Sequence, residues 1–563
     1  MSKREIVLSG CDGTEYVFFP ACCYDGNRFR VLKKEYPPMY DPHEAGVDMP
    51  VTITDIPRLE EDGDGKIQVT TGDLSTPCVG VYVRRTGRAI LVFTAQSLGG
   101  SNIGLAYERG RITLTAPASR DYIYYWPHLY KNDEAYTDWD GEIPCEVVEF
   151  DCGDMETFYR IFFENRKIMG MDDTRASVLS AGRQFEIQRE KFNGMNWKEA
   201  DGFYDIDTNG MWQPGWVGGG MAGYALMKLG GPVEQERAVK TLWYLFENQA
   251  PETGLFYGFR ADRNDGFGTP GTENWVLIRK SADSLYFLFK HFALMNDIPR
   301  VFIDGTKKLA DTFVAIWERY GQFGQFVDCR SGDMVVGNST CGAIVPAALI
   351  SAFRYFGDSR YLNTALESAD RMYVRDARSG YTTGGPGEIL QCPDSESAFA
   401  LLESTVLLYE ETGDRLWLER SEFMAHLCSS WVVCYNYRFP DGSEFSRLGM
   451  KTVGSVFANA QNKHSAPGIC TLSGDSLHKL HKWTGNSLYK ELIDDISLTI
   501  SQYMSTRERP IRAWDGSILP SGVICERVNM SDWERVGCVG GVFNGSCWCE
   551  TSNLLTLAEC PGT

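Results

Sequence analysis

Three carboxylates stand close together in a loop that precedes an apolar helix, and they are the first candidates for chemistry. Glu388, Asp394 and Glu396 occur in GGPGEILQCPDSE (384–396), a stretch rich in Gly and Pro. Apolar residues at helical spacing follow, then a turn at 412–414 and a second helix. Cleavage of a glycosidic bond needs two carboxyl groups, one protonated at the leaving oxygen and one acting on water or on the anomeric carbon. This loop therefore offers candidates for such a pair.

A fourth carboxylate, Glu273, lies in another Gly-rich loop, DRNDGFGTPGTENW (262–275). Burial or a like-charged neighbour would keep one member of a pair protonated by raising its pKa. Asp394 stands directly before a predicted helix, so an N-cap role also explains it. Glu396 falls in the first helical turn, where it also complements the helix dipole. Any two of the four could form the pair, and we favour Glu396 with Glu273.

Residues suited to holding a sugar occur in comparable loops. His464 and Lys463 lie in the polar loop NKHSAPG (462–468), and Arg279 and Lys280 are further cations for an anionic sugar. Trp rings stack on the C–H faces of sugars, and Asp side chains fix hydroxyl groups. The other predicted substrate-binding residues are of these two kinds or carry a phenol: Trp212, Trp216, Trp275, Trp533, Tyr381 and Asp207.

The sequence predicts neither a metal nor a cofactor. DIDTNG (205–210) resembles the start of a calcium loop, but the twelfth position counted from Asp205 is Trp216, where a bidentate Glu is required. HExxH, Walker and dinucleotide fingerprints do not occur in the sequence. The 17 Cys include no CxxC pair, and many have apolar neighbours. We interpret them as reduced, buried thiols.

The candidate loops belong to a repeating unit of loop, apolar inner helix, turn and outer helix. The turns combine Gly or Asn with Gly, Asp or Asn, and each precedes a predicted outer helix: 230–231, 296–297, 357–358, 413–414 and 485–486. Six inner helices are predicted but only five outer helices follow residue 200, so 155–195 is expected to supply the sixth. An open solenoid would need polar caps, whereas the terminal segment is apolar and rich in Cys.

The fold class predicted is therefore mainly α with a β domain: an N-terminal antiparallel β-sandwich over 1–152, then an (α/α)6 toroid over 153–563. Short β-branched runs separated by Gly, Pro, Asp and Asn indicate the sandwich. In the toroid, the loops that enter the inner helices converge on one face, where helix N-termini supply positive partial charge. With 563 residues, the chain is long enough for two domains.

The composition limits the kinds of partner that the protein is expected to bind. The net charge is −20 and no basic tract occurs, which argues against nucleic acid and anionic membranes. No run of about 18 apolar residues is present, so no membrane-spanning helix is expected. The start of the sequence lacks the apolar core of a signal peptide, and we expect a cytoplasmic protein. An oligosaccharide is the predicted partner, and a homo-oligomer stays open.

The predicted order, a β-rich part followed by six helical hairpins, resembles bacterial six-hairpin glycosidases. Two loop motifs add to this resemblance: NMSDWE (529–534) near the end and NKHSAPG in the fifth loop. It looks most like the β-glucuronidases of glycoside hydrolase family 154. The architectural resemblance covers about residues 150–560. It implies exo-acting hydrolysis of a terminal glucuronic acid without a metal. It assigns no residue, so the candidates are those named above.

Three alternatives remain. An unsaturated uronyl hydrolase, which hydrates a double bond, would need an acid/base Asp but no pair. A uronate lyase would use a Tyr/His pair, for which Tyr381 and His464 are available. A sugar-binding protein without catalysis would keep its function after Glu396→Gln and Glu273→Gln.

Overall fold

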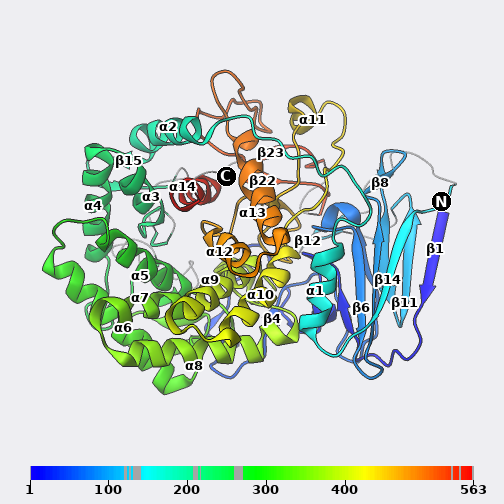
Figure 1. Ribbon diagram of the computed structural model, residues 1–563, viewed down its shortest axis with the longest axis horizontal. Coiled ribbons are helices and arrows are strands. Elements are labelled where there is room, and N and C mark those ends of the chain that lie inside the picture. Colours follow the sequence, from blue (N-terminus) through cyan, green and yellow to red (C-terminus); the bar gives the residue numbers. More distant parts are fainter. Residues whose placement is uncertain are drawn as a thin grey trace.

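The computed structural model describes residues 2–118, 141–206, 213–215, 217–258, 270–533, 537–543, 545 and 547–560, with the backbone of two short strands, β12 (Ile123–Tyr125) and β13 (His128–Tyr130). Three predicted binding residues, Asp207, Trp212 and Trp216, lie outside the described residues. Figure 1 shows β-sheets at the N-terminal side and a ring of helices beside them. No helix in the described part of the chain is long and apolar enough to cross a membrane.

The N-terminal part contains two four-stranded antiparallel sheets. The first has the order β1 (Ser2–Val7), β11 (Arg111–Ala116), β10 (Gly104–Glu108), β5 (Ile67–Thr70). The second has the order β14 (Cys145–Asp151), β7 (Arg88–Thr94), β6 (Cys78–Val83), β2 (Tyr16–Phe18). Residues of both sheets, among them Val69 and Leu105 of the first and Val79 and Val92 of the second, share one hydrophobic cluster. The predicted antiparallel pairing is therefore present.

Short strand pairs complete the N-terminal part and the entry into the ring. They are β3 (Arg30–Val31) with β4 (Thr52–Ile53), β8 (Ser97–Leu98) with β9 (Ser101–Asn102), and β15 (Trp197–Lys198) with β16 (Phe203–Tyr204). The β3–β4 pair is parallel, unlike the sheets around it.

Aromatic packing joins the second sheet to the helices through α1 (Met155–Asn165). The ring centroid of Phe18 lies 5.7 Å from that of Phe158 and 5.1 Å from that of Phe162. Gly80 of β6 lies under Phe158, whose Cζ is 2.8 Å from where a Cβ would stand, so a side chain there would displace the ring. Rings of this size contribute much of the buried area where two elements meet. The second sheet and α1 therefore pack together as one unit.

The helices form a closed ring of inner and outer members (Figure 1). The inner helices are α3 (Met221–Leu229), α5 (Ile278–Phe292), α7 (Val345–Phe356), α9 (Ser395–Thr412), α12 (Asp475–Thr484) and α14 (Trp548–Glu559). The outer helices are α4 (Pro232–Glu247), α6 (Arg300–Tyr320), α8 (Ser359–Arg375), α10 (Arg415–Ser429) and α13 (Ser487–Ile500), and a short helix α11 (Glu444–Leu448) lies outside this order. The last inner helix packs against the first, which closes the ring as the repeat predicts.

The sixth outer position is taken by α2 (Ala181–Lys191), which packs on α14. Asn553 of α14 donates to Gln188 of α2 at 3.0 Å. Helix α1 packs on α10 instead and carries the contact with the sheet. The segment 155–195 therefore supplies the missing outer helix, as expected, but only its second helix serves that purpose.

Turn chemistry explains why the repeat is visible in the sequence. A Gly in the left-handed region ends an inner helix, and the next residue caps the outer helix by accepting a hydrogen bond from a backbone N–H. The Gly φ angles are 73° at Gly357, 66° at Gly413 and 73° at Gly485. Asp358, Asp414 and Asn486 are the N-caps that follow them. Each pair reverses the chain within two residues.

Successive loops at the N-terminal ends of the inner helices are joined by backbone contacts. Strands β17 (Trp275–Leu277), β18 (Phe326–Asp328) and β19 (Met334–Val336) join the second and third loops. Thr340 N–H donates to Thr383 O at 3.1 Å, and Ser395 N–H donates to Ala458 O at 2.9 Å, which joins the fourth loop to its neighbours. Strands β20 (Ser455–Phe457), β21 (Ser465–Pro467), β22 (Arg527–Val528) and β23 (Val542–Phe543) join the fifth and sixth. We call this end of the ring the mouth.

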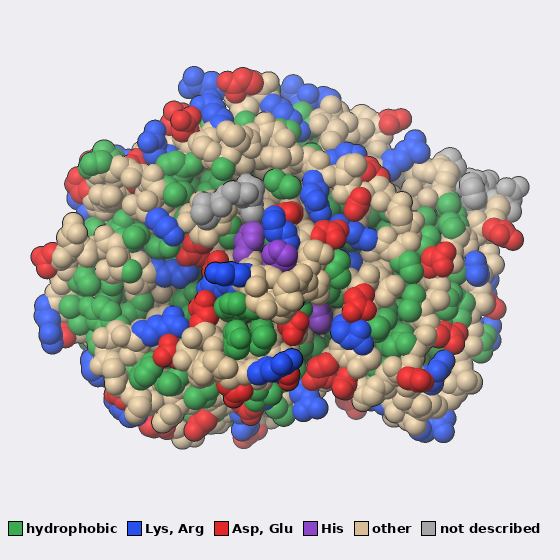
Figure 2. All heavy atoms as spheres, viewed as in Figure 1, with side chains coloured by type: hydrophobic (Ala, Val, Ile, Leu, Met, Phe, Trp, Pro, Cys, Tyr) green, Lys and Arg blue, Asp and Glu red, His purple; other side chains and the backbone are tan. Residues whose placement is uncertain are grey.

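The cysteines are free thiols, and all except Cys11 and Cys145 are buried. On the face in Figure 2, Lys and Arg side chains are interspersed with Asp and Glu over the described surface. On this face, acidic and basic side chains are therefore mixed rather than gathered into one patch.

Candidate active site

A buried ion cluster centred on Arg279 lies where three inner helices begin. Arg279 is 4% exposed and is ion-paired with Glu396 of α9. Its Nε donates to Asp283, one turn further along α5, at 3.1 Å. Its guanidinium carbon lies 6.0 Å from the centroid of the Trp548 ring of α14. The charge predicted to bind substrate is therefore already neutralised within the protein, and Arg279 ties α5 to α9 and α14.

Asp394 is the N-cap of α9, as its sequence position suggested. Its Oδ1 accepts from Ser397 N–H at 2.7 Å, and its Oδ2 accepts from Gly385 N–H at 3.0 Å. The Ser397 hydroxyl donates to Oδ2 at 3.1 Å. The side chain is 0% exposed, and burial raises its pKa to about 6 against the opposing effect of these hydrogen bonds and of Arg279. Asp394 is therefore a fully engaged cap whose ionisation costs folding free energy.

This raised pKa predicts how stability depends on pH. The folded pKa, about 6, exceeds the usual 3.8, so the contribution of Asp394 to stability is fully present below about pH 3.8 and is lost as the pH rises through 6. This rise in pKa corresponds to about 3 kcal/mol of unfolding free energy. We expect the difference in unfolding free energy between wild type and Asp394→Asn to change by about that amount, in favour of the variant, from about pH 3.5 to about pH 7.5. Urea titrations at the two pH values measure it. A difference independent of pH contradicts the assigned pKa.

The Gly-rich part of the fourth loop lies directly over the start of α9. A Cβ on Gly385 would stand 2.8 Å from the Cβ of Glu396 and in collision with Asp394. Gly384 has a φ of 80° and meets Ser339 of the third loop in the same way. Glu396 is only 3% exposed beneath this cover. The loop therefore packs directly on Asp394 and Glu396.

Glu388 occupies a different position in the same loop. It is only partly buried, in the short helical turn Gly387–Ile389. Burial raises its pKa; Lys280 and Arg279 of α5 oppose the shift, and Glu526 of the sixth loop adds to it. Groups from the second and sixth loops thus act on a carboxyl of the fourth. Of the four predicted carboxylates, Glu388 is the one that the structure brings together with groups from around the mouth while leaving it accessible.

Glu526 is a site residue that the sequence did not single out. It directly precedes β22 and is partly buried, and its backbone N–H donates to Phe543 O at 2.8 Å. A second acidic residue nearby, Glu550, is instead committed to structure: it accepts from Ile524 N–H at 3.0 Å, and its carboxylate lies 3.8 Å from Lys191 Nζ. Only the pairing of β22 with β21 and β23, which the sequence hardly signals, brings Glu526 to the mouth.

Lys463, His464 and Trp533 come together where the fifth and sixth loops meet. Lys463 Nζ lies 5.5 Å from the centroid of the Trp533 ring, and both residues are buried. Burial and, to a smaller extent, the charge of Arg527 lower the pKa of His464 to about 3. His464 is therefore a neutral imidazole near pH 7, suited to a hydroxyl rather than to a carboxylate.

The remaining predicted residues belong to none of these clusters. Glu273 is exposed and accepts from Gly271 N–H at 2.9 Å; this bond lowers its pKa, opposite to what a proton donor needs. Trp275 packs on Phe326, with ring centroids 6.4 Å apart. Tyr381 packs edge-on against Phe29 of the N-terminal part at 5.1 Å, and burial raises its pKa. In the favoured pairing, Glu396 is thus ion-paired and buried, whereas Glu273 is a solvated turn residue.

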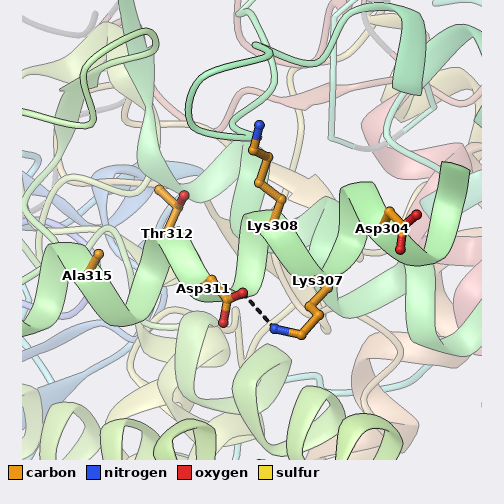
Figure 3. Close-up of a pocket in the computed structure, with 6 residues that line it drawn as sticks. All are labelled: Asp304, Lys307, Lys308, Asp311, Thr312 and Ala315. Carbon is orange, nitrogen blue, oxygen red and sulfur yellow. Dashed lines mark hydrogen bonds and ion pairs between the residues drawn. The ribbon is translucent and has the colours of Figure 1, made fainter.

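Two further clusters outside the mouth are satisfied internally. Figure 3 shows an open hollow of about 400 Å³ along α6, lined by Asp304, Lys307, Lys308, Asp311, Thr312 and Ala315. Lys307 is ion-paired with Asp311 at 2.8 Å, and Lys308 and Thr312 donate to backbone carbonyls of the 251–253 turn. Near the N-terminal part, Asp41, His43 and Glu44 could hold a cation, but Lys34 Nζ already bridges Asp41 and Glu44 at 3.0 and 2.5 Å.

The comparisons with known proteins concern the general architecture. No protein-family model and no curated protein matches the chain. Among solved structures, a D-mannose isomerase matches with TM-score 0.47 and 10% identity, over 67% of this chain and 96% of that chain. Cellobiose 2-epimerase from Bacillus thermoamylovorans gives 0.46 and 12%, over 72% and 99%. A family 76 glycoside hydrolase from a bovine Bacteroides thetaiotaomicron strain gives 0.44 and 11%, over 84% and 95%. At these values the likeness carries no conclusion about the reaction.

Proposed function

We propose that the mouth of the ring is the active site of a glycoside hydrolase that works by carboxyl acid–base chemistry. The observation that carries the proposal is the position of Glu388. It combines a pKa raised by burial with partial exposure, and charged groups of the second and sixth loops act on it. A carboxyl whose pKa is raised by burial, with charged groups of other elements acting on it, has the property that a glycosidase acid needs.

In this proposal Glu388 is the general acid and Glu526 is the second carboxyl. Glu388 gives its proton to the glycosidic oxygen as the bond from that oxygen to the anomeric carbon breaks. Glu526 either removes a proton from the water that attacks the anomeric carbon or attacks that carbon itself, after which water releases the sugar. The separation of the two carboxyl groups in the complex decides between inversion and retention.

The ion cluster below them has a positioning role. Arg279 is buried and paired with both Glu396 and Asp283, and Asp394 caps the start of α9. A buried network of paired charges helps to keep side chains and helix ends in one arrangement. It holds α5 and α9, and with them Lys280 and the loop of Glu388, at fixed positions around the mouth.

We propose a terminal uronic acid, in β-linkage, as the sugar removed. The chain carries a net charge of −20, so an anionic substrate needs local cations at the site. Lys280 and Lys463 supply them at the mouth, and Trp533 offers an aromatic face beside Lys463. Lys463 and Trp533 are not part of the proposed acid–base pair, so the sugar is a separate claim from the reaction class.

We further propose that residues 1–152 form an antiparallel β-sandwich domain and residues 153–563 the catalytic domain. Supporting this division, the two sheets share a hydrophobic cluster of their own. The N-terminal part also reaches the mouth: a Cβ on Gly72 would collide with Met530 O of the sixth loop. The sandwich would thus support the sixth loop from behind.

A panel of p-nitrophenyl glycosides tests the reaction class and the sugar together. We expect release of p-nitrophenol from the β-glucuronide, with kcat/KM at least about tenfold above that for the β-glucoside, because one hydrogen bond to a charged group contributes about 1.5–3 kcal/mol. Turnover of the β-glucoside alone would overturn the uronic acid. An unsaturated uronide belongs in the same panel. Loss of its double-bond absorbance without cleavage of any saturated glycoside would favour the hydration mechanism instead.

A further inference from the structure

An asparagine in the sixth loop has no explanation in the fold. The side chain of Asn529 is 1% exposed, yet neither its Oδ1 nor its Nδ2 has a hydrogen-bond partner among the described residues. Its backbone is well placed, since its carbonyl accepts from Gly540 N–H at 3.1 Å. A buried carboxamide left unpaired costs about 1–3 kcal/mol. Buried polar groups are nearly always paired in folded proteins, so a group that is not calls for another role.

Lys463 presents the same anomaly nearby. Other buried cations of the described chain have internal partners: Arg279 has Glu396, Arg420 has Asp370, and Lys191 has Asn196. Lys463 is 1% exposed, and its Nζ has no hydrogen-bond acceptor among the described residues. It has only the face of Trp533, which attracts a desolvated cation by about 2 kcal/mol. That is much less than the cost of burying an ammonium group unpaired.

Strand register brings the two residues to one place. Ser465 of β21 is opposite Val528 of β22 in an antiparallel pair. Asn529 directly follows Val528, and Lys463 and His464 directly precede Ser465, so these residues leave the antiparallel pair at the same end. Trp533, four residues after Asn529, reaches back to Lys463. Two unpaired polar side chains and an aromatic face therefore share the junction of the fifth and sixth loops.

We infer that Asn529 is a specificity-determining residue, which together with Lys463 forms a subsite for a carboxylate next to a hydroxyl group. A carboxylate oxygen would accept from Lys463 Nζ and from Asn529 Nδ2, and the adjoining hydroxyl would donate to Asn529 Oδ1. The inference rests on the proposed uronic acid substrate. In such a sugar the hydroxyl beside the carboxylate-bearing carbon is the one at C4. Asn529 would therefore recognise the configuration at C4, whereas Lys463 would recognise the negative charge of the carboxylate.

The test compares Asn529→Leu with a matched control, Asn459→Leu. Asn459 is equally buried, but its Oδ1 accepts from Gln461 and Asn462 N–H, both at 3.0 Å. We expect Asn529→Leu to keep or raise Tm, because it replaces an unpaired polar group by an apolar one of similar size, and Asn459→Leu to lower it. Calorimetric titration with glucuronate should show at least a tenfold weaker Kd for Asn529→Leu, together with loss of discrimination against galacturonate. Lys463→Met should instead lose the discrimination between glucuronate and glucose.

The outcomes separate this inference from the proposed reaction. If Asn529→Leu lowers Tm as Asn459→Leu does and binds glucuronate like wild type, Asn529 is structural and the subsite is wrong, whatever the enzyme hydrolyses. If no glycoside is cleaved but glucuronate binding follows the expected pattern, the subsite stands and the hydrolase is wrong. If wild type binds neither uronate in calorimetry, the subsite is overturned as well.

Discussion

Replacing Glu388 with Gln is expected to lower kcat by about 10²–10⁴-fold on a disaccharide substrate and far less on a p-nitrophenyl glycoside. The physical reason lies in the leaving group. A sugar alkoxide must be protonated as it departs, whereas p-nitrophenolate departs readily as an anion. Glu526→Gln removes the second carboxyl and is expected to slow both substrates. Steady-state kinetics on the two substrates distinguish an acid from a base or nucleophile.

Glu273→Gln is the matched control for both variants. Glu273 also lies in a loop at the mouth end of the ring, but it is solvated, and its pKa is lowered rather than raised. The activity and stability of Glu273→Gln should stay near those of wild type, as for most surface substitutions. If Glu388→Gln and Glu526→Gln are as active as Glu273→Gln on the disaccharide, the catalytic pair proposed for the mouth is wrong.

The free energy of unfolding is expected to fall by about 3–5 kcal/mol in Arg279→Met, because the substitution leaves Glu396 and Asp283 buried without their common partner. Denaturant titration near pH 7 measures the loss. The loss should shrink in Arg279→Met combined with Glu396→Gln, since the second change removes one of the orphaned charges.

A surface pair gives the control for this prediction. Arg415 is ion-paired with Glu419 at 3.3 Å on the outer side of the ring, and both side chains are exposed. Arg415→Met should cost no more than about 0.5 kcal/mol. An equal, small cost for Arg279→Met and Arg415→Met would show that the buried cluster does not hold the ring together.

The architecture was predictable because its signals are local. Each Gly–Asp or Gly–Asn turn specifies the end of one helix and the start of the next within two residues, as at Gly413 and Asp414. Counting these turns gave the number of outer helices and the shortage of one, which α2 fills. The cap role of Asp394 was likewise visible from its place before an apolar helix.

The site was less predictable because its properties depend on contacts between distant loops. Whether a carboxyl is an acid, an ion-pair partner or a solvated turn residue depends on what surrounds it, and Glu388, Glu396 and Glu273 differ in that respect alone. Glu526 and Asn529 owe their positions to the pairing of β21 with β22. A pair of strands this short leaves almost no alternation in the sequence.

The contact between α14 and α3 has a consequence for how the protein is made. These two inner helices are separated by nearly the whole helical part of the chain, yet each covers the other's apolar side. During synthesis the earlier hairpins can stack as they emerge, but the face of α3 stays exposed, and Lys191 lacks Glu550, until α14 has left the ribosome. Contacts of such long sequence separation form late. Glu526 and Asn529 also come late in the chain, so the mouth would be completed only in the last stage of folding.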